Sequence, residues 1–293
     1  MVTIPDLPAL YLTLILGPTQ AQFLQKPTPP ACAANELPAK TIGIPEVDLP
    51  RSFTIREHSH RIHNPFTSEK LAALGQALNP PPGTRMLDLA CGSGEMLCTW
   101  ARDHHITGTG VDISTVFLAA ARARALELDV AEQVTFTHGD ASNHVADDPV
   151  DIGSCVGATW IGGGVAGTVD LLRRSLRPGG TMLIGEPYWR RQPPNQAAIE
   201  GCHATSEDDF RPLPDLLEHF GDLGCDVVEM VLADQDSWDR YVAAQWLSGS
   251  ASAAGWTHIP KTSWPSRCAR NSLPPPHATP DTNANTSDGA SSR

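Results

Sequence analysis

Residues 88–94 read DLACGSG, and this stretch decides the fold of the 293-residue chain. It ends a short apolar run at residues 85–90 and precedes a helical pattern at residues 94–105. Gly92 and Gly94 remove side chains where the backbone must turn sharply and approach a ligand. The stretch therefore predicts a strand, a glycine turn and a helix, and the turn alone fits either a cofactor site or a purely structural corner.

Strand and helix patterns alternate outward from this turn. Short strands separated by helical patterns of about 10–15 residues are typical of a mostly parallel, doubly wound α/β sheet with helices on both faces. Such sheets bind ligands beyond the carboxyl ends of their strands. Strands are predicted at residues 85–90, 107–112, 134–137, 150–156, 181–185 and 226–232, and helices at 67–78, 94–105, 114–128, 165–176, 213–220 and 237–246.

Composition divides the chain into three parts. Residues 1–45 are rich in proline and carry two acidic and two basic residues, and residues 248–293 are rich in Ser, Thr, Asn and Pro with no apolar period. We predict a poorly ordered leader, one folded domain at residues 46–247, and a polar, disordered tail. The domain holds 15 basic and 29 acidic residues, a net charge of −14, which disfavours nucleic acid and anionic membranes as partners.

The apolar run at residues 9–16 is far shorter than the roughly 20 residues of a membrane span. Asp6 precedes this run and no Lys or Arg does, which is unlike a secretory signal. The seven cysteines are scattered and form no C-x-x-C pair, so neither disulfides nor a zinc site is predicted. Reduced thiols favour a cytoplasmic protein.

Further motifs follow the later strands. Asp112, in VDIS, stands where a carboxylate can bind both ribose hydroxyls or simply complement a helix dipole. Asp140, in GDA, fits either an acceptor for an adenine amino group or a plain turn residue. Leu97 occupies the third small position of the nicotinamide fingerprint, and Asp88 precedes the loop, so a nicotinamide-dependent dehydrogenase is disfavoured. A nearby carboxylate without a pyrophosphate cradle suits a ligand that carries positive charge.

In this order and spacing, DLACGSG, VDIS, GDA and LRPGGTMLIGE resemble the class I S-adenosylmethionine-dependent methyltransferases, over about residues 66–232. One departure is Ala90, where the family usually has glycine. The resemblance implies S-adenosyl-L-methionine as cofactor. It places the methionine moiety at the loop of Ala90, Gly92 and Gly94, and the amino group or sulfonium at Asp88. It places the ribose at Asp112 beside Ile113, and the adenine at Asp140 and Ala141. Cys155 and Val156 would form the floor beneath the methyl group.

The acceptor side is predicted from two other stretches. Together with DSWDRY at residues 236–241, EPYW at residues 186–189 and SHRIHNPF at residues 59–66 look like a bacterial branch of the superfamily whose substrates are mostly unassigned. Catalytic candidates are Glu186, which would orient or deprotonate the acceptor, Tyr188 as a substrate wall, and His63 as a base on a lid. The alternatives are loop packing for the first two and an ordinary polar entry loop for His63.

The histidine spacing H-x-H-x-x-H, which ends at His63, has no partner Cys/His pair elsewhere, so no metal site is predicted. Methyl transfer is an in-line displacement on an activated sulfonium, so positioning can supply much of the catalysis and a dedicated base is optional.

The sequence therefore predicts methyl transfer from S-adenosylmethionine to a small-molecule acceptor of unknown identity. The alternative is an S-adenosylmethionine-binding module with little or no catalysis. In the bacterial branch, long amphipathic helices follow the position of Trp246, whereas this chain continues as the polar tail; a shifted reading frame would account for that. The sequence makes no prediction of the oligomeric state.

Overall fold

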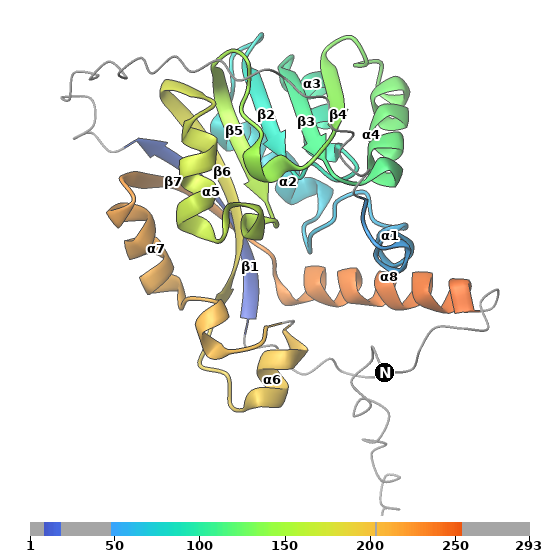
Figure 1. Cartoon of the computed structure of the whole chain (residues 1–293), viewed down its shortest axis with the longest axis vertical. Helices are drawn as coiled ribbons and strands as arrows, with labels where there is room; N and C mark the ends of the chain where they lie inside the picture. Colours follow the sequence, from blue (N-terminus) through green and yellow to red (C-terminus); the bar gives the residue numbers. More distant parts are fainter. Residues whose placement is uncertain (1–8, 19–47, 203, 254–293) are drawn as a thin grey trace, which may run out of the picture. The chain divides into compact units, whose positions relative to one another are not determined.

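The computed structural model describes residues 9–18, 48–202 and 204–253. Seven strands form a sheet in the order β4-β3-β2-β5-β6-β1-β7 (Figure 1). Neighbouring strands from β4 to β6 run parallel, and β1 runs antiparallel to both β6 and β7. The predicted doubly wound, mostly parallel α/β sheet is confirmed.

The element bounds follow the sequence pattern closely in the middle of the chain. The strands are β1 (Ala9–Pro18), β2 (Arg85–Leu89), β3 (Thr107–Asp112), β4 (Val134–His138), β5 (Val150–Val156), β6 (Leu176–Trp189) and β7 (Cys225–Leu232). The helices are α1 (Arg51–Glu57), α2 (Ser68–Leu78), α3 (Glu95–His104), α4 (Thr115–Glu127), α5 (Val165–Arg173), α6 (Gln196–Gly201), α7 (Leu213–Asp222) and α8 (Gln235–Ala253), with short 3-10 turns η2 (Ala141–Asn143), η3 (Thr159–Gly162) and η4 (Glu207–Asp209).

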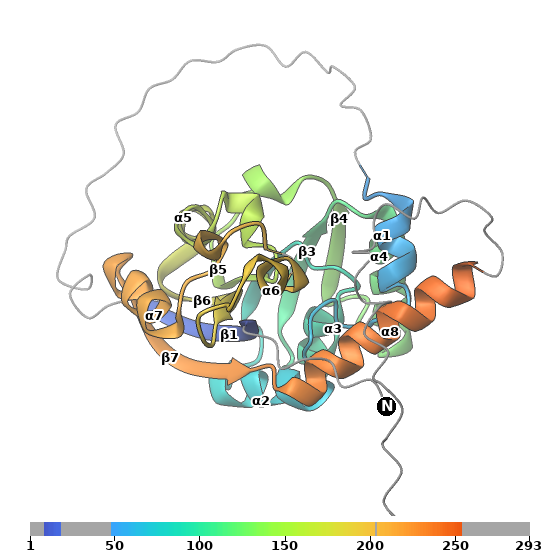
Figure 2. The same cartoon turned by 90° about the horizontal axis from the view of Figure 1, so that it is seen from below.

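Helices cover both faces of the sheet. One face packs against α2, α3 and α4, with Leu74, Trp100 and Leu118 buried. The other face packs against α5 and α7, with Leu172 and Phe220 buried (Figure 2). Burial of these apolar surfaces provides the main driving force for folding. Among the described helices, none is long and apolar enough to cross a membrane.

Two predicted boundaries move. The helix predicted to reach residue 176 ends at Arg173, because β6 already begins at Leu176. The RPGG stretch at residues 177–180 lies inside β6, where Gly179 takes a φ of +80°. At the other end of the domain, α8 continues to Ala253, beyond the predicted boundary at residue 247.

The largest difference from the sequence prediction is β1. Residues 9–18 belong to the predicted leader, yet they form a strand between β6 and β7. Leu12, Leu14 and Leu16 are fully buried on the side of α5 and α7, and Ile15 is buried on the opposite side. An apolar run with both faces covered is a buried strand, so for these residues the structure corrects the prediction of disorder. The other predicted leader residues, and the tail after Ala253, lie outside the described residues.

Candidate functional site

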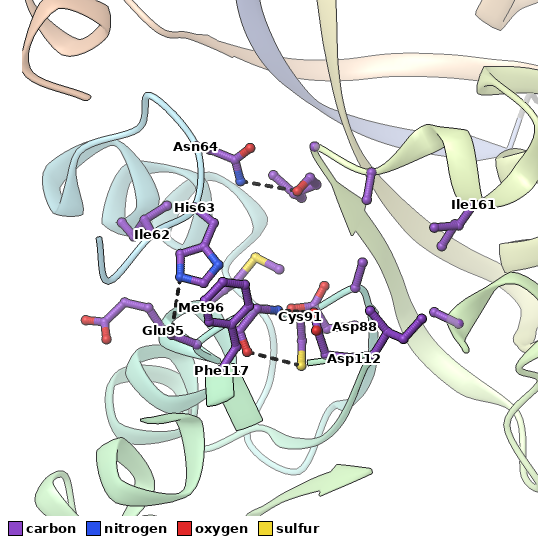
Figure 3. A pocket seen from close by; sticks show the side chains of 18 of the residues that line it. Ile62, His63, Asn64, Asp88, Cys91, Glu95, Met96, Asp112, Phe117 and Ile161 are labelled. Atoms are coloured by element: carbon purple, nitrogen blue, oxygen red, sulfur yellow. Dashed lines mark hydrogen bonds between the residues drawn. The ribbon is translucent and has the colours of Figure 1, made fainter. Parts of the chain in front are cut away.

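A cavity of about 470 Å³ lies at the carboxyl ends of β2, β3 and β5 (Figure 3). Its walls come from the loops that follow β2 to β5, from residues 49–66 before α2, from α2 and from β1. The volume is within the range of about 300–1,000 Å³ that is usual for small-molecule sites. This is the edge at which a doubly wound sheet is expected to bind its ligand.

The glycine loop between β2 and α3 forms one wall. Ala90, Gly92 and Gly94 have φ values of +57°, +54° and +68°. A Cβ on Gly92 would lie 2.8 Å from Nδ1 of His63, and one on Gly94 would lie 2.6 Å from the ring of Phe136. The loop therefore needs glycine at both positions, and it brings the N-terminus of α3 close to the cavity, where backbone N–H groups favour polar ligand atoms.

Asp112 ends β3 with its carboxylate fixed beside this loop. The N–H of Gly92 donates to Oδ2 at 2.8 Å, and the N–H of Ser114 donates to Oδ1 at 2.8 Å. Burial raises the pKa of Asp112, while these two N–H donors oppose that rise. The orientation is set before any ligand arrives, and each carboxylate oxygen keeps a lone pair that can accept from a hydroxyl.

Asp88 is the second buried carboxyl on the wall. It is 4% exposed and accepts a hydrogen bond from Oγ of Ser154 at 2.6 Å. Burial raises the pKa of Asp88 to about 7, and the charge of Asp112 acts in the same direction. A cationic ligand group beside Asp88 would favour its ionised form. The carboxyl groups of Asp112 and Asp88 therefore fit a ligand that carries both hydroxyl groups and a positive charge.

The predicted adenine residues also lie on the wall. Asp140, Ala141 and Ile113 all line the cavity. Oδ1 of Asp140 accepts from the N–H of Ser142 at 2.9 Å and so caps η2. Both sequence interpretations of Asp140, turn residue and cavity residue, are thus compatible with its position.

His63 covers the glycine loop from above. Its Nε2 lies 3.0 Å from Oγ of Ser93, and its ring centroid lies 4.0 Å from that of Phe117 (Figure 3). Burial lowers the pKa of His63 to about 4, so the imidazole is neutral at physiological pH. His60 points elsewhere, with Nδ1 2.9 Å from Oε2 of Glu57, so the clustered histidines of the sequence do not converge.

Other predicted site residues are not on the cavity wall. Glu186 accepts from Oγ1 of Thr159 at 2.6 Å, and burial raises its pKa to about 7. Tyr188 and Cys155 are buried in the core on the side of α5 and α7. Of the three catalytic candidates, the structure therefore brings only His63 to the cavity. Val156 does line the cavity, and its carbonyl oxygen accepts from Nδ2 of Asn64 at 3.2 Å. Gly94 is not among the lining residues, although Ser93 and Glu95 on either side of it are.

Several wall residues have no counterpart among the sequence candidates. They include Thr13 of β1, Phe53 of α1, Leu71 and Leu74 of α2, and Phe117 of α4. The apolar members read as core positions on helical faces, because hydrophobic periodicity does not separate a residue packed in the core from one facing a cavity. Thr13 belongs to a segment that composition assigns to the leader.

Three proteins and a family model place the chain among known sequences. Residues 86–180 match a family described as a methyltransferase domain. A solved S-adenosylmethionine-dependent methyltransferase from Geobacter sulfurreducens, in complex with S-adenosyl-L-homocysteine, is 64% identical with a TM-score of 0.70, over 71% of this chain and 84% of that one. YjhP, an uncharacterised Escherichia coli K12 protein, is 60% identical over 202 residues, 69% of this chain and 82% of YjhP. The 27-O-demethylrifamycin SV methyltransferase of Amycolatopsis mediterranei is 30% identical over 105 residues, 36% of this chain and 39% of that enzyme.

Proposed function

The chain belongs to the class I S-adenosylmethionine-dependent methyltransferases, and we propose that it transfers the methyl group of this cofactor to a small-molecule acceptor. The supporting observation is the preorganised Asp112 beside the glycine loop, at the mouth of a cavity large enough for a small ligand. When bound, S-adenosylmethionine supplies an electrophilic methyl group on a sulfonium. The side chains of the protein bind and orient the cofactor and the acceptor.

The cofactor residues divide by the chemistry that each can offer. Asp112 would accept from the ribose hydroxyls, and Asp88 would place negative charge near the cationic end of the cofactor. Asp140 and Ala141 would contact the adenine, and Val156 would form part of the floor. The backbone of the glycine loop would hold the methionine moiety.

In this proposal the protein catalyses the transfer mainly by positioning the acceptor, and deprotonation by a side chain contributes little. His63, with a pKa of about 4, is a weak base at neutral pH. Its bond to Ser93 fits it for holding residues 49–66, which we call the lid, on the glycine loop. Glu186 acts through Thr159, at the start of η3, whose next residues line the cavity. We therefore assign Glu186 a positioning role. Tyr188 and Cys155 would contribute to the packing beneath the site.

A small molecule fits the site better than a polymer. The domain is strongly acidic, which disfavours nucleic acid, and residues 49–66 and the loops after β2 to β5 together wall a cavity of about 470 Å³. The Amycolatopsis relative is named for a small-molecule acceptor, which supports the same class here. We also propose a cytoplasmic location, because the seven cysteines are scattered along the sequence and predict no disulfide framework.

The test has two measurements. Isothermal calorimetry with S-adenosylhomocysteine should show one-site binding, and incubation of the protein with methyl-labelled S-adenosylmethionine and cell extract should label a low-molecular-mass product. Cofactor binding with no labelled product would support the binding-module alternative. Tight binding of a nicotinamide dinucleotide in place of S-adenosylhomocysteine would reject the proposal.

A further inference from the structure

Resting on the proposed function, we infer that the acceptor is a neutral, largely apolar small molecule whose one polar group is held by the hydroxyl of Thr13. This hydroxyl lies in the part of the cavity that the cofactor residues do not occupy.

The cavity has two chemically different ends. Asp112 lies at the end of β3, and Thr13 lies in β1, four strands away in the order β3-β2-β5-β6-β1. Neighbouring strands are about 4.8 Å apart, so the two residues stand on the order of 19 Å apart along the sheet. One cavity thus reaches from the proposed ribose site to β1, which leaves room for a second ligand beside the cofactor.

Thr13 faces this far end because of the sheet register. It pairs with Gly185 of β6, and Gly185 pairs with Val156 of β5. Cross-strand neighbours share a face of the sheet, and Gly185 has no side chain, so nothing on β6 separates Thr13 from Val156 at this row. Both Thr13 and Val156 line the cavity.

The far end is formed by lining residues of β1, of α2 and of the segment just before α2, and none of them is ionisable. They are Thr13, Phe66, Leu71 and Leu74, of which the last three belong to the same core cluster as Ile15 of β1. The basic side chain on the cavity wall, Arg61, is already paired, with an N–O distance of 4.0 Å to Glu95 and 3.4 Å to Glu127. An unpaired charge buried among apolar groups is strongly disfavoured, so a charged acceptor does not fit this end.

The hydroxyl of Thr13 is the polar exception. Thr13 is fully buried, and its Oγ1 has no hydrogen-bond partner among the described residues. Two other described side chains have such an atom, Gln235 at Oε1 and Trp238 at Nε1, but neither lines the cavity. A buried hydroxyl without a partner destabilises a fold, whereas valine offers nearly the same shape without that penalty. A hydroxyl or carbonyl on the acceptor would complete the bond.

Three naphthalene probes test the inference on protein saturated with S-adenosylhomocysteine. They are 2-naphthol, 6-hydroxy-2-naphthoate, which adds a negative charge, and naphthalene, which lacks the hydroxyl. Fluorescence titration should give 2-naphthol an affinity at least about tenfold higher than that of the naphthoate, from the cost of burying an unpaired charge. Thr13→Val should weaken 2-naphthol binding about fivefold and leave naphthalene binding unchanged, because one hydrogen bond is lost.

Matched variants separate this effect from damage to the fold. Thr13→Ser keeps the hydroxyl and should retain most of the 2-naphthol affinity. Thr84→Val removes a buried hydroxyl that donates to the carbonyl of Pro81 at 2.6 Å outside the cavity, so it should lower stability and leave probe binding intact. Thr13→Val itself should melt at or above the temperature of the parent protein.

The outcomes distinguish this inference from the proposed function. Equal affinities for 2-naphthol and the naphthoate, unchanged 2-naphthol binding in Thr13→Val, or no binding of any probe would overturn the acceptor class while cofactor binding persists. Failure of S-adenosylhomocysteine to bind the parent protein would instead reject the proposed function itself.

Discussion

Ala90 carries backbone strain that a single substitution can relieve. Its φ of +57° is in the left-handed region, which costs an L-residue about 1–2 kcal/mol relative to glycine. Glycine loses more conformational entropy on folding, which offsets roughly half of that gain. We expect Ala90→Gly to raise the free energy of unfolding by about 0.5–1 kcal/mol, measured by urea denaturation.

The control for Ala90→Gly is Ala120→Gly, at an exposed position inside α4. Glycine in a helix interior costs about 1 kcal/mol relative to alanine, so this variant should be less stable than the parent. Destabilisation by both substitutions would contradict the left-handed conformation of Ala90.

Asp112 is expected to dominate cofactor affinity. Removing a charged hydrogen-bond acceptor costs about 1.5–3 kcal/mol, so Asp112→Ala should weaken S-adenosylhomocysteine binding by that amount in calorimetry. Asp103→Ala is the matched control, because that exposed carboxylate pairs only with Arg102 among the interactions of the described residues and lies outside the cavity. Unchanged affinity in Asp112→Ala would remove Asp112 from the ribose role.

Asp88 makes stability depend on pH. Its pKa is about 7 in the folded protein, against 3.8 for an unperturbed carboxyl. The native state therefore holds a proton that the unfolded state releases between pH 4 and 7, so Asp88 destabilises the fold increasingly as pH rises through that window. In Asp88→Asn the amide oxygen can still accept the hydrogen bond from Ser154, and the side chain cannot ionise.

The stability difference between Asp88→Asn and the parent should therefore be small at pH 4 and favour the variant by about 2–4 kcal/mol at pH 8. Denaturation by urea in the absence of cofactor, at several pH values, measures it. A pH-independent difference would mean that Asp88 is not protonated in the native state at neutral pH.

At this residue scale, the sequence predicted the cofactor wall better than the acceptor wall. Asp88, Asp112 and Asp140 stand at or just after the carboxyl ends of strands, in motifs whose spacing is local, so their convergence follows from parallel strands sharing one edge. Thr13 and Leu71 carry no such signal. Their position depends on which distant segments pack against them, and local periodicity does not contain that information.

At the scale of elements, α1 and α8 are joined by one buried carboxylate. Glu57, at the end of α1, is 1% exposed. It accepts hydrogen bonds at 2.9 Å from Nδ1 of His60, the hydroxyl of Tyr241 and Nε2 of Gln245. Burial would raise the pKa of Glu57, but the hydrogen bonds outweigh it and the net pKa is lowered. Because Phe53 of α1 lines the cavity, this cluster holds the lid in place (Figures 1 and 2).

Tyr241→Phe should loosen the lid without removing it. Loss of a hydrogen bond to a buried charge costs about 1.5–3 kcal/mol, so hydrogen exchange at residues 51–57 should accelerate roughly tenfold or more, and S-adenosylhomocysteine should dissociate faster. Arg240→Ala, which removes an exposed pair with Asp236, should change neither rate measurably. Equal exchange in Tyr241→Phe and the parent would show that α1 is held by other contacts.

The elements that the sequence missed are short or distant from the main pattern. The helices α1 and α6 have 7 and 6 residues, too few for a helical period to stand out. The central strands and helices were predicted closely because each has a clear apolar run, a cap or a glycine stop. At the start of α4, for example, Ser114 is the cap, and its Oγ accepts from the N–H of Phe117 at 3.3 Å.

For the whole molecule, β1 determines whether the sheet is continuous. The strand pairs with β6 on one side and β7 on the other, and Leu14 stands between Ile184 and Met230. Without β1, the described parts of β6 and β7 would not hydrogen-bond to each other. The proline-rich composition around this segment predicts disorder, because no local feature records a vacant position between two strands that come much later in the chain.

Deleting residues 1–18 should therefore damage the entire fold. The apolar edges of β6 and β7 would lose their hydrogen-bond partners, and exposed edges of this kind promote aggregation. Leu14→Ala tests the same strand more gently, because it removes a fully buried side chain and should cost about 2–5 kcal/mol of unfolding free energy. Val228→Ala in β7 is the control, since Val228 is 67% exposed and its truncation should have little effect. A deletion variant that keeps the oligomeric state, melting temperature and cofactor affinity of the parent would show that β1 does not complete the sheet. The assignment of Thr13 to the acceptor end would then also fail.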